Sequence, residues 1–213
     1  MQCRLCNSIM EPFTAGGLLY GDCPVCGYIQ IDAGRLPGPR DEQARYELHH
    51  NSYDDRGYTG WIGSYLDRIV PILPAGGTVL DFGSGPEPVP GRLLSERGFD
   101  VCLYDPYFAP ATAWRDRSWQ AIMLHEVAEH LAHPAAALSE LRPLLAPKGA
   151  LCLRTRFAPD DRTDFEGWWY RMDSTHVGFF RERTIRWIAR YWQLQPAIIE
   201  PPDTAVLLAP AGG

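Results

Sequence analysis

The sequence TVLDFGSGPEPVPGRLLSERGFDVCLYD at residues 78–105 determines how the rest of the chain must fold. It opens with an apolar, partly β-branched run that predicts a short buried strand, followed by Asp81. The small residues at 82–85 predict a turn where the backbone bends sharply and a ligand can come close. A helix is expected next, ended by Gly98, and then a second strand that ends at Asp105. The sequence therefore predicts a β-turn-α-β unit, whose ligand binds beyond the carboxyl ends of the strands.

The glycine spacing in this unit separates two kinds of cofactor. Gly83 and Gly85 fit the first two glycines of the dinucleotide pattern G-x-G-x-x-G, but Pro88 occupies the third position. Glu87 also lies where a pyrophosphate would have to approach. A nucleoside cofactor without phosphates tolerates both features, and Asp105 would bind its ribose hydroxyls. The alternative is an ordinary βα turn with two glycines.

The unit resembles motif I of class I S-adenosylmethionine (SAM) methyltransferases, whose pattern is roughly acid-x-Gly-x-Gly. Asp81, Gly83 and Gly85 match that pattern, and Asp105 matches the ribose-binding acid. The cofactor-binding residues that we predict from the unit and its resemblance are Asp81, Phe82, Gly83, Ser84, Gly85, Asp105, Pro106, Tyr107, His125 and Glu126.

The chain after Asp105 is short for this family. The next predicted strand, at 121–124, follows where a full class I fold would first place another strand and a helix, with an acid that contacts adenine. We expect that third strand to be short or absent. Adenine recognition would then fall to Pro106, Tyr107, Phe108 or backbone groups, since aromatic faces suit a flat purine.

The segment QAIMLHEVAEHLAH at 120–133 contains several metal-binding residue types. A metal hydrolase with H-E-x-x-H would need His at position 129, where Glu129 stands. The segment instead resembles the strand and Glu-Val-x-Glu-His element of small-molecule class I methyltransferases. The resemblance places His125 beside the methionine part of SAM. It also places residues 126–130 at the start of the next helix, which they would cap and orient.

The aromatic segment at 165–180 carries the candidates for catalysis. It resembles a W-Y-x-x-D-x-T-H-V segment that lies beside the active-site mouth in this family. His176 is the predicted general base, because imidazole can take a proton near neutral pH. Asp173 would orient His176, and Tyr170 would assist. The alternative is a structural hydrogen-bonded knot that ties the loop to the fold.

Four cysteines near the N-terminus form two C-x-x-C pairs: Cys3, Cys6, Cys23 and Cys26. Two such pairs predict a structural zinc site with four thiolate ligands, and the segment resembles a zinc ribbon. So short a segment buries too little apolar area to fold alone, so metal would supply the missing stability. Two disulfides or four free thiols are the alternatives, and a cytosolic chain disfavours disulfides.

The segment before the β-turn-α-β unit, residues 46–58, is rich in Tyr, His and Asp. In class I methyltransferases this part often folds over the cofactor as a lid. The resemblance therefore suggests that Tyr46, His50, Asn51 or Tyr53 faces the site. A solvated loop is the alternative.

The predicted fold is α/β: a Rossmann-like, mostly parallel sheet with an antiparallel hairpin at its C-terminal edge, preceded by a small zinc ribbon. The predicted domains are 1–34 for the ribbon and 41–213 for the methyltransferase. Further helices are expected at 41–50, 61–73, 138–145 and 184–192, and strands at 10–20, 28–32, 151–153, 198–199 and 205–208.

The predicted function is transfer of a methyl group from SAM to a small-molecule acceptor. A net charge of −6 makes nucleic acid an improbable partner, although the ribbon could bind a protein. No apolar run suggests a membrane span or a signal peptide, so we expect a cytoplasmic protein. The alternatives are an RNA or protein methyltransferase that uses the ribbon as reader, and a non-catalytic SAM-fold protein that binds a partner.

Overall fold

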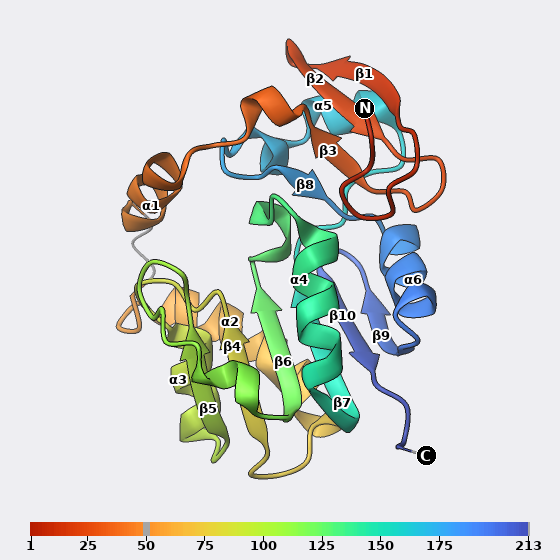
Figure 1. Cartoon of the computed structure of the whole chain (residues 1–213). Helices are drawn as coiled ribbons and strands as arrows, with labels where there is room; N and C mark the ends of the chain where they lie inside the picture. The colour runs from red at the N-terminus through yellow and green to blue at the C-terminus, as the bar shows by residue number, and fades with distance from the viewer. Residues whose placement is uncertain (49–51, 213) are drawn as a thin grey trace.

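A six-stranded sheet forms the centre of the computed structural model, which describes residues 1–48 and 52–212 (Figure 1). Its strand order is β5-β4-β6-β7-β10-β9. The strands are β4 (Thr78–Phe82), β5 (Asp100–Tyr104), β6 (Trp119–His125), β7 (Leu145–Arg154), β9 (Gln195–Glu200) and β10 (Thr204–Leu208). The first four run parallel, and β10 is antiparallel to both β7 and β9. The predicted α/β sheet with an antiparallel C-terminal hairpin is confirmed.

The β5 strand is an edge of this sheet, as the short chain after Asp105 predicts. Residues 106–118 are all described and contain no strand; their one regular element is the 3-10 helix η3 (Ala113–Asp116). The buried side chain of Trp114 in η3 stacks near Phe82 and Tyr104, at 5.5 and 4.9 Å between ring centroids. The aromatic side chain of Trp114 thus covers one face of the sheet at β4 and β5.

Helices cover both faces of the sheet because strand residues alternate between them. Val79 packs with the buried side of α2 (Arg56–Ile69) and α3 (Val89–Glu96). Leu80, the next residue, packs with α4 (Pro134–Leu141) and α6 (Glu182–Tyr191). The remaining helices are α1 (Pro39–Glu47), α5 (Arg162–Gly167), η1 (Ala33–Arg35), η2 (Val70–Ile72), η4 (Ala128–His130), η5 (Arg142–Leu144) and η6 (Trp169–Met172). No helix in the described ranges is both long and apolar enough to cross a bilayer.

The helix expected at 138–145 begins earlier and ends earlier than predicted. Pro134 opens α4, because proline fits the first turn of a helix. Leu145 already belongs to β7, where it pairs with Trp119. The expectation that residues 126–130 cap this helix is wrong: its N-cap is His133, which makes no side-chain capping bond.

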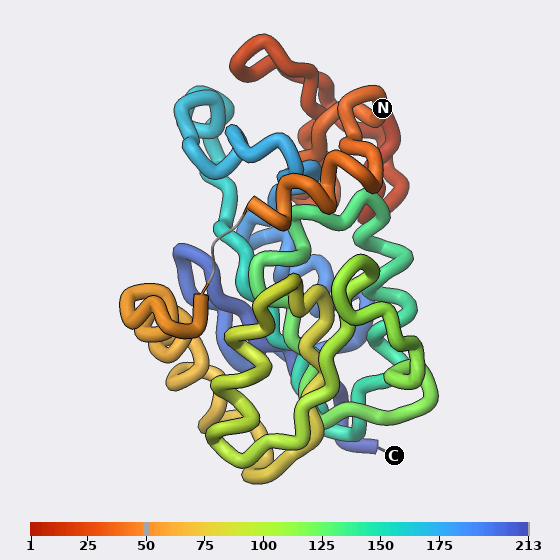
Figure 2. Tube along the Cα trace, turned by 90° about the vertical axis from the view of Figure 1, so that its left-hand side faces the viewer, coloured from red at the N-terminus to blue at the C-terminus, as the bar shows by residue number. Residues whose placement is uncertain are grey.

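A second, four-stranded sheet lies at the end of the molecule opposite the C-terminus (Figures 1 and 2). It contains β1 (Glu11–Ala15), β2 (Leu18–Asp22) and β3 (Ile29–Ile31) from the cysteine-rich segment. Its fourth strand, β8 (Gly178–Phe179), comes from the aromatic segment near the C-terminus and pairs antiparallel with β3. The cysteine-rich ribbon therefore shares a sheet with the segment that carries His176, and the domain division at 34 and 41 stays a prediction.

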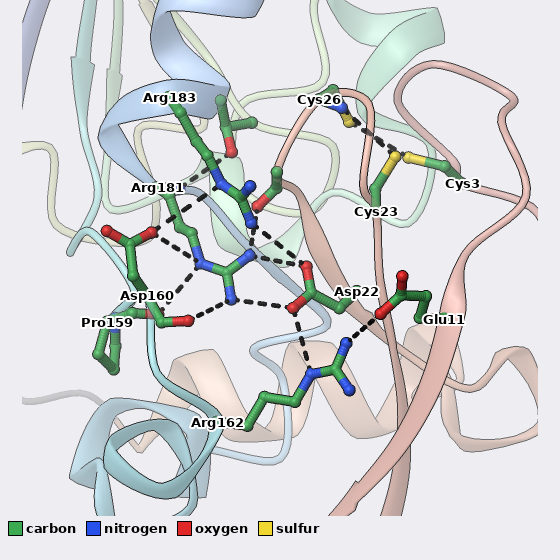
Figure 3. A network of polar contacts seen from close by, with 12 residues as sticks. Cys3, Glu11, Asp22, Cys23, Cys26, Pro159, Asp160, Arg162, Arg181 and Arg183 are labelled. Carbon is green, nitrogen blue, oxygen red and sulfur yellow. Dashed lines mark hydrogen bonds and ion pairs between the residues drawn. The ribbon is translucent and has the colours of Figure 1, made fainter.

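A buried ion pair fastens the ribbon to α6 (Figure 3). The Arg181 side chain is 1% exposed, and its two terminal nitrogens lie 2.7 and 3.1 Å from the carboxylate oxygens of Asp22. Arg181 also donates to the carbonyl oxygens of Gly27 and Pro159. These two parallel hydrogen bonds fix the orientation of Arg181 relative to Asp22, and so link the start of α6 to the end of β2.

Candidate functional site

A cavity of about 560 Å³ opens at the carboxyl ends of β4, β5 and β6. This is the position at which parallel α/β sheets bind their ligands. Its lining includes all ten predicted cofactor-binding residues: Asp81, Phe82, Gly83, Ser84, Gly85, Asp105, Pro106, Tyr107, His125 and Glu126. His176 lines the same cavity. Segments from four parts of the sequence thus meet around one space.

The turn after β4 requires glycine at its first position. Gly83 has φ of 83°, a conformation that side chains disfavour. A Cβ atom there would lie 2.6 Å from the side chain of Val127, which follows β6. Gly85, at φ of 68°, donates its N–H to Asp105 at 3.0 Å. The glycines therefore let the turn pass close to β6 and join the tip of β5.

Asp105 is held rigidly at the tip of β5. One carboxylate oxygen accepts the Gly85 N–H, and the other accepts the N–H groups of Tyr107 and Phe108 at 2.9 and 3.1 Å. Oδ2, which accepts one N–H, keeps a lone pair for a further donor. This orientation suits a group that binds vicinal hydroxyls.

Asp81 is 2% exposed, and its Oδ2 has no hydrogen-bond partner in the described chain. Burial raises the pKa of Asp81 to about 7, helped by the charge of Asp105, while the Gly91 N–H acts in the opposite direction. An orphaned buried carboxylate oxygen on a cavity wall is a fitting partner for a cationic ligand group.

His125 is neutral because of its surroundings. It packs between Trp61 and Tyr65, and its Nε2 lies 3.2 Å from the Arg154 guanidinium. Arginine only donates, so Nε2 accepts and the proton sits on Nδ1. Burial, and then the Arg154 charge, lower the pKa of His125 to about 3. No imidazolium charge therefore forms on this wall near neutral pH.

His176 presents one nitrogen as a base. Its Nδ1 lies 2.7 Å from the backbone carbonyl of Tyr170, and a carbonyl can only accept, so Nδ1 carries the proton. Nε2 then keeps its lone pair. Burial lowers the pKa of His176, against the raising effect of the Glu129 carboxylate. The ring therefore stays neutral and able to accept a proton at pH 7.

The Tyr170 side chain supports the site from outside the cavity. Its hydroxyl donates to Glu129, and Oε2 of Glu126 lies 3.0 Å from it. Tyr170 is 2% exposed and is not among the lining residues, although its ring centroid is 4.2 Å from that of His176. The structure therefore brings Tyr170 to His176 by packing.

Asp173 lies in the turn before His176. Its carboxylate accepts from Arg45 of α1 at 2.7 Å and from the hydroxyl and N–H of Thr175 at 2.6 and 3.0 Å. Burial would raise the pKa of Asp173, but the Arg45 and Thr175 donors outweigh it and hold that pKa well below its usual range. The His176 N–H donates to the Asp173 carbonyl.

The α1 helix forms part of the cavity wall. Glu42 and Tyr46 both line the cavity, and Glu42 accepts the Tyr107 hydroxyl at 2.7 Å. Tyr53 instead donates to Glu96 and is not a lining residue. His50 and Asn51, also suggested for the lid, lie outside the described residues.

Several lining residues are not predicted by the sequence reasoning. Besides Glu42, they are Tyr58, Trp61, Pro86, Glu87, Pro90, Tyr104, Val127, His130, Leu131 and Ala132. Trp61 fits the apolar pattern of an amphipathic helix, which gave no reason to place it on a cavity. The position of His130, five residues after His125, could have indicated that it lies at the cavity. The sequence pattern instead predicts a helix-capping role for it. Ligand-capable atoms of Glu129, His130 and His176 lie within 4.8 Å of one another.

The four N-terminal cysteines converge, as predicted. Their sulfur atoms all lie within 4.8 Å of one another, with 3.6 Å between Cys3 and Cys26 and 3.4 Å between Cys6 and Cys23. Figure 3 shows three of the four, Cys3, Cys23 and Cys26. A tetrahedral zinc with Zn–S bonds of about 2.3 Å separates its sulfurs by about 3.8 Å. The cluster is therefore compatible with a closed zinc site.

The sequence matches the family described as "Methyltransferase domain" over residues 53–195. This chain belongs to that family, and its fold is that of the SAM-dependent methyltransferases. Among curated proteins, none matches the sequence.

Solved structures show the same fold at low sequence identity. A methyltransferase from Burkholderia thailandensis that acts on 1,6-didemethyltoxoflavin, solved with S-adenosylhomocysteine, is 15% identical at a TM-score of 0.57, over 95% of this chain and 100% of its own. Magnesium protoporphyrin IX methyltransferase from Synechocystis is 16% identical at 0.53, over 80% and 94%. A SAM-dependent methyltransferase from Archaeoglobus fulgidus is 16% identical at 0.51, over 70% and 93%.

Proposed function

We propose that this chain binds SAM in the cavity beyond β4, β5 and β6 and transfers its methyl group to a small-molecule acceptor. The observation that carries the proposal is the convergence of all ten predicted cofactor-binding residues, with His176, around one cavity. Asp105 would hold the ribose hydroxyls, Asp81 would face the cationic methionine end, and Tyr107 would pack near adenine.

Bound SAM supplies a methyl group on a sulfonium, which leaves as a neutral thioether when the acceptor atom attacks. A hydroxyl acceptor loses its proton as it attacks, and a protonated amine must lose its proton before it can attack. His176 takes that proton at Nε2, because Nδ1–H is committed to the Tyr170 carbonyl. Tyr170 and Asp173 hold the segment around His176 in place.

The neutral state of His125 supports the same proposal. A sulfonium is a cation, and an imidazolium beside it would weaken its binding. Burial of His125, and then the charge of Arg154, lower the pKa of the imidazole and keep it uncharged. The wall next to Asp81 thus favours a positive ligand.

A small-molecule acceptor fits the charge and the shape of the site. The chain has a net charge of −6, which opposes binding to a phosphate backbone. The cavity is partly closed by Glu42 and Tyr46 of α1, and a closed site admits small acceptors more readily than a folded RNA or protein. The named substrates of the Burkholderia and Synechocystis enzymes are also small molecules.

We further propose that the cysteine cluster holds one structural Zn²⁺, with Cys3, Cys6, Cys23 and Cys26 as ligands. The sulfur separations support this ligand set, and four protein ligands leave no open position for catalysis. Reduced cysteines require a reducing compartment, so the proposal places the protein in the cytoplasm.

The test is transfer of a labelled methyl group from SAM to a panel of small phenols, alcohols and amines. For an acceptor that is methylated, His176→Asn should lower kcat by about 100-fold or more, since general-base catalysis contributes that much. S-adenosylhomocysteine affinity should stay unchanged.

His133→Asn is the matched control, because His133 is exposed and its side chain caps nothing. Equal losses of kcat in His176→Asn and His133→Asn would show that His176 is not the general base. Binding of S-adenosylhomocysteine with no transfer to any acceptor would favour the non-catalytic, partner-binding alternative.

A further inference from the structure

Arg4 connects the cysteine cluster to the segment that carries His176. It stands in the first C-x-x-C pair, next to Cys3. Its terminal Nη2 donates to the carbonyl of Val177 at 2.6 Å, across the interface between ribbon and methyltransferase fold. Its own backbone N–H donates to the Gln30 side chain in β3 at 2.8 Å, so the arginine is anchored at its base as well as its tip.

Val177, the residue directly after His176, is held from two sides. Its N–H donates to the carbonyl of Glu129 at 2.8 Å, on the side of the SAM fold. Its carbonyl accepts both the Ile31 N–H at 3.1 Å and the Arg4 guanidinium, on the side of the ribbon. The backbone position of His176 therefore depends on both parts of the chain.

The Arg4 guanidinium is only partly paired within the described residues. Its Nε and Nη1 are buried without a hydrogen-bond partner, and within the described residues Arg4 forms no ion pair with a carboxylate. A partly buried cation without a direct ion-pair partner is costly, so a neighbouring anion would stabilise it.

The cysteine cluster would be that neighbour once it holds the proposed metal. Four thiolates around one Zn²⁺ carry a net charge of about −2. Cys3 is the residue before Arg4 and contributes one of the four sulfurs. The metal-loaded cluster then compensates the cation that holds Val177.

We propose that Arg4 is a positioning residue that couples the zinc-thiolate cluster to the acceptor side of the active site. Through Val177 it holds His176 in place, and its charge in turn stabilises the metal-loaded cluster. The role of His176 as a base rests on the proposed function. The coupling of the cluster to the segment that carries His176 rests only on contacts within the chain.

The test compares Arg4→Gln with Arg35→Gln in the full-length, zinc-loaded protein. Arg35 is an exposed cation on the same ribbon and serves as the matched control. Hydrogen exchange followed by mass spectrometry should show about tenfold faster exchange over residues 170–180 in Arg4→Gln, because a charged hydrogen bond is lost. Residues 79–105 and the S-adenosylhomocysteine affinity should not change, and Arg35→Gln should behave as wild type.

The second readout is zinc affinity, measured by competition with a chromophoric chelator at pH 7. Arg4→Gln should bind zinc about tenfold more weakly, since the dianionic cluster loses a neighbouring cation. Arg4→Lys keeps the charge but not the planar guanidinium, so it should restore most of the zinc affinity and only part of the protection at 170–180. Arg4→Lys also serves as the test variant if Arg4→Gln does not fold.

Unchanged exchange at 170–180, or equal acceleration in every part of the chain, would overturn the proposal. Zinc affinity equal to that of wild type in Arg4→Gln would also overturn it. A zinc-loaded protein that binds no S-adenosylhomocysteine would refute the proposed function and leave the exchange comparison unaffected, so the two failures are distinguishable.

Discussion

At the scale of single residues, the buried Asp81 carboxylate lowers the free energy of unfolding of the unliganded protein when it is ionised. Its folded pKa of about 7 lies above the usual value of 3.8, because burial disfavours the carboxylate. Between these two pH values the folded state binds the extra proton, so stability falls as pH rises from about 4 to about 7. Above pH 7 the cost of the buried charge is fully present.

Asp81→Asn should therefore stabilise the unliganded protein at pH 8 by about 1–3 kcal/mol and change little at pH 4. The same variant should bind S-adenosylhomocysteine at least about tenfold more weakly. Thermal melts at the two pH values, with calorimetry at pH 8, measure both effects. If Asp81→Asn is less stable than wild type at pH 8, the Asp81 carboxylate is already stabilised by the protein in the absence of a ligand.

Gly178 is required by a close contact between the ribbon and the segment after His176. A Cβ atom at this position would lie 1.6 Å from the hydroxyl of Tyr28, which is fully buried. Gly178→Ala should destabilise the protein by about 1–3 kcal/mol, because an overpacked site must shift backbone. Gly167→Ala is the control, since nothing lies within 4 Å of that position. Equal unfolding midpoints in urea for the two variants would contradict this packing.

At the scale of secondary-structure elements, the Asp22–Arg181 pair joins β2 to the start of α6. Asp22→Asn would leave the buried Arg181 guanidinium with only the exposed Asp160 carboxylate, at 3.5 Å, which should cost about 3–5 kcal/mol. The exposed pair of Arg186 and Glu182 on α6 gives the comparison: Arg186→Gln should cost about 0.5 kcal/mol or less. Chemical denaturation of both variants measures the difference, and similar losses would show that the buried pair is not what fastens the ribbon.

The main elements could be predicted because their signals are local. The apolar run before Asp81, the glycine turn and the acid at 105 define the first unit within one stretch of chain. The absent third strand was also predictable, because too few residues separate Asp105 from β6. The pairing of β8 with β3 was not, because two residues of strand carry no periodic pattern and their partner lies far away in sequence.

The same difference between local signals and long-range contacts explains which residues of the candidate site could be predicted. Residues of the glycine turn and the strand ends were predicted because the motif itself carries them. Glu42, Trp61 and His130 were missed because tertiary contacts, such as that between Glu42 and Tyr107, bring them to the cavity. For Glu129, the motif suggested a helix cap, while in the structure its carboxylate accepts the Tyr170 hydroxyl.

At the scale of the whole molecule, two parts of the chain form the candidate active site. The six-stranded sheet supplies the cofactor side through the ends of β4, β5 and β6. The segment at 170–177, which carries the proposed base His176, is held between that sheet and the ribbon. The ribbon is therefore a structural part of the proposed active site.

The central claim is that the cavity beyond the parallel strands binds SAM, and calorimetry with S-adenosylhomocysteine tests it most directly. The account predicts micromolar binding to the zinc-loaded protein. It also predicts a loss of at least about tenfold in Asp105→Ala, because a hydrogen bond from a ribose hydroxyl to a charged carboxylate is worth that much. Asp116→Ala, in η3 away from the cavity lining, should bind as wild type. No binding to the folded, zinc-loaded protein, or equal binding by Asp105→Ala, would contradict the account.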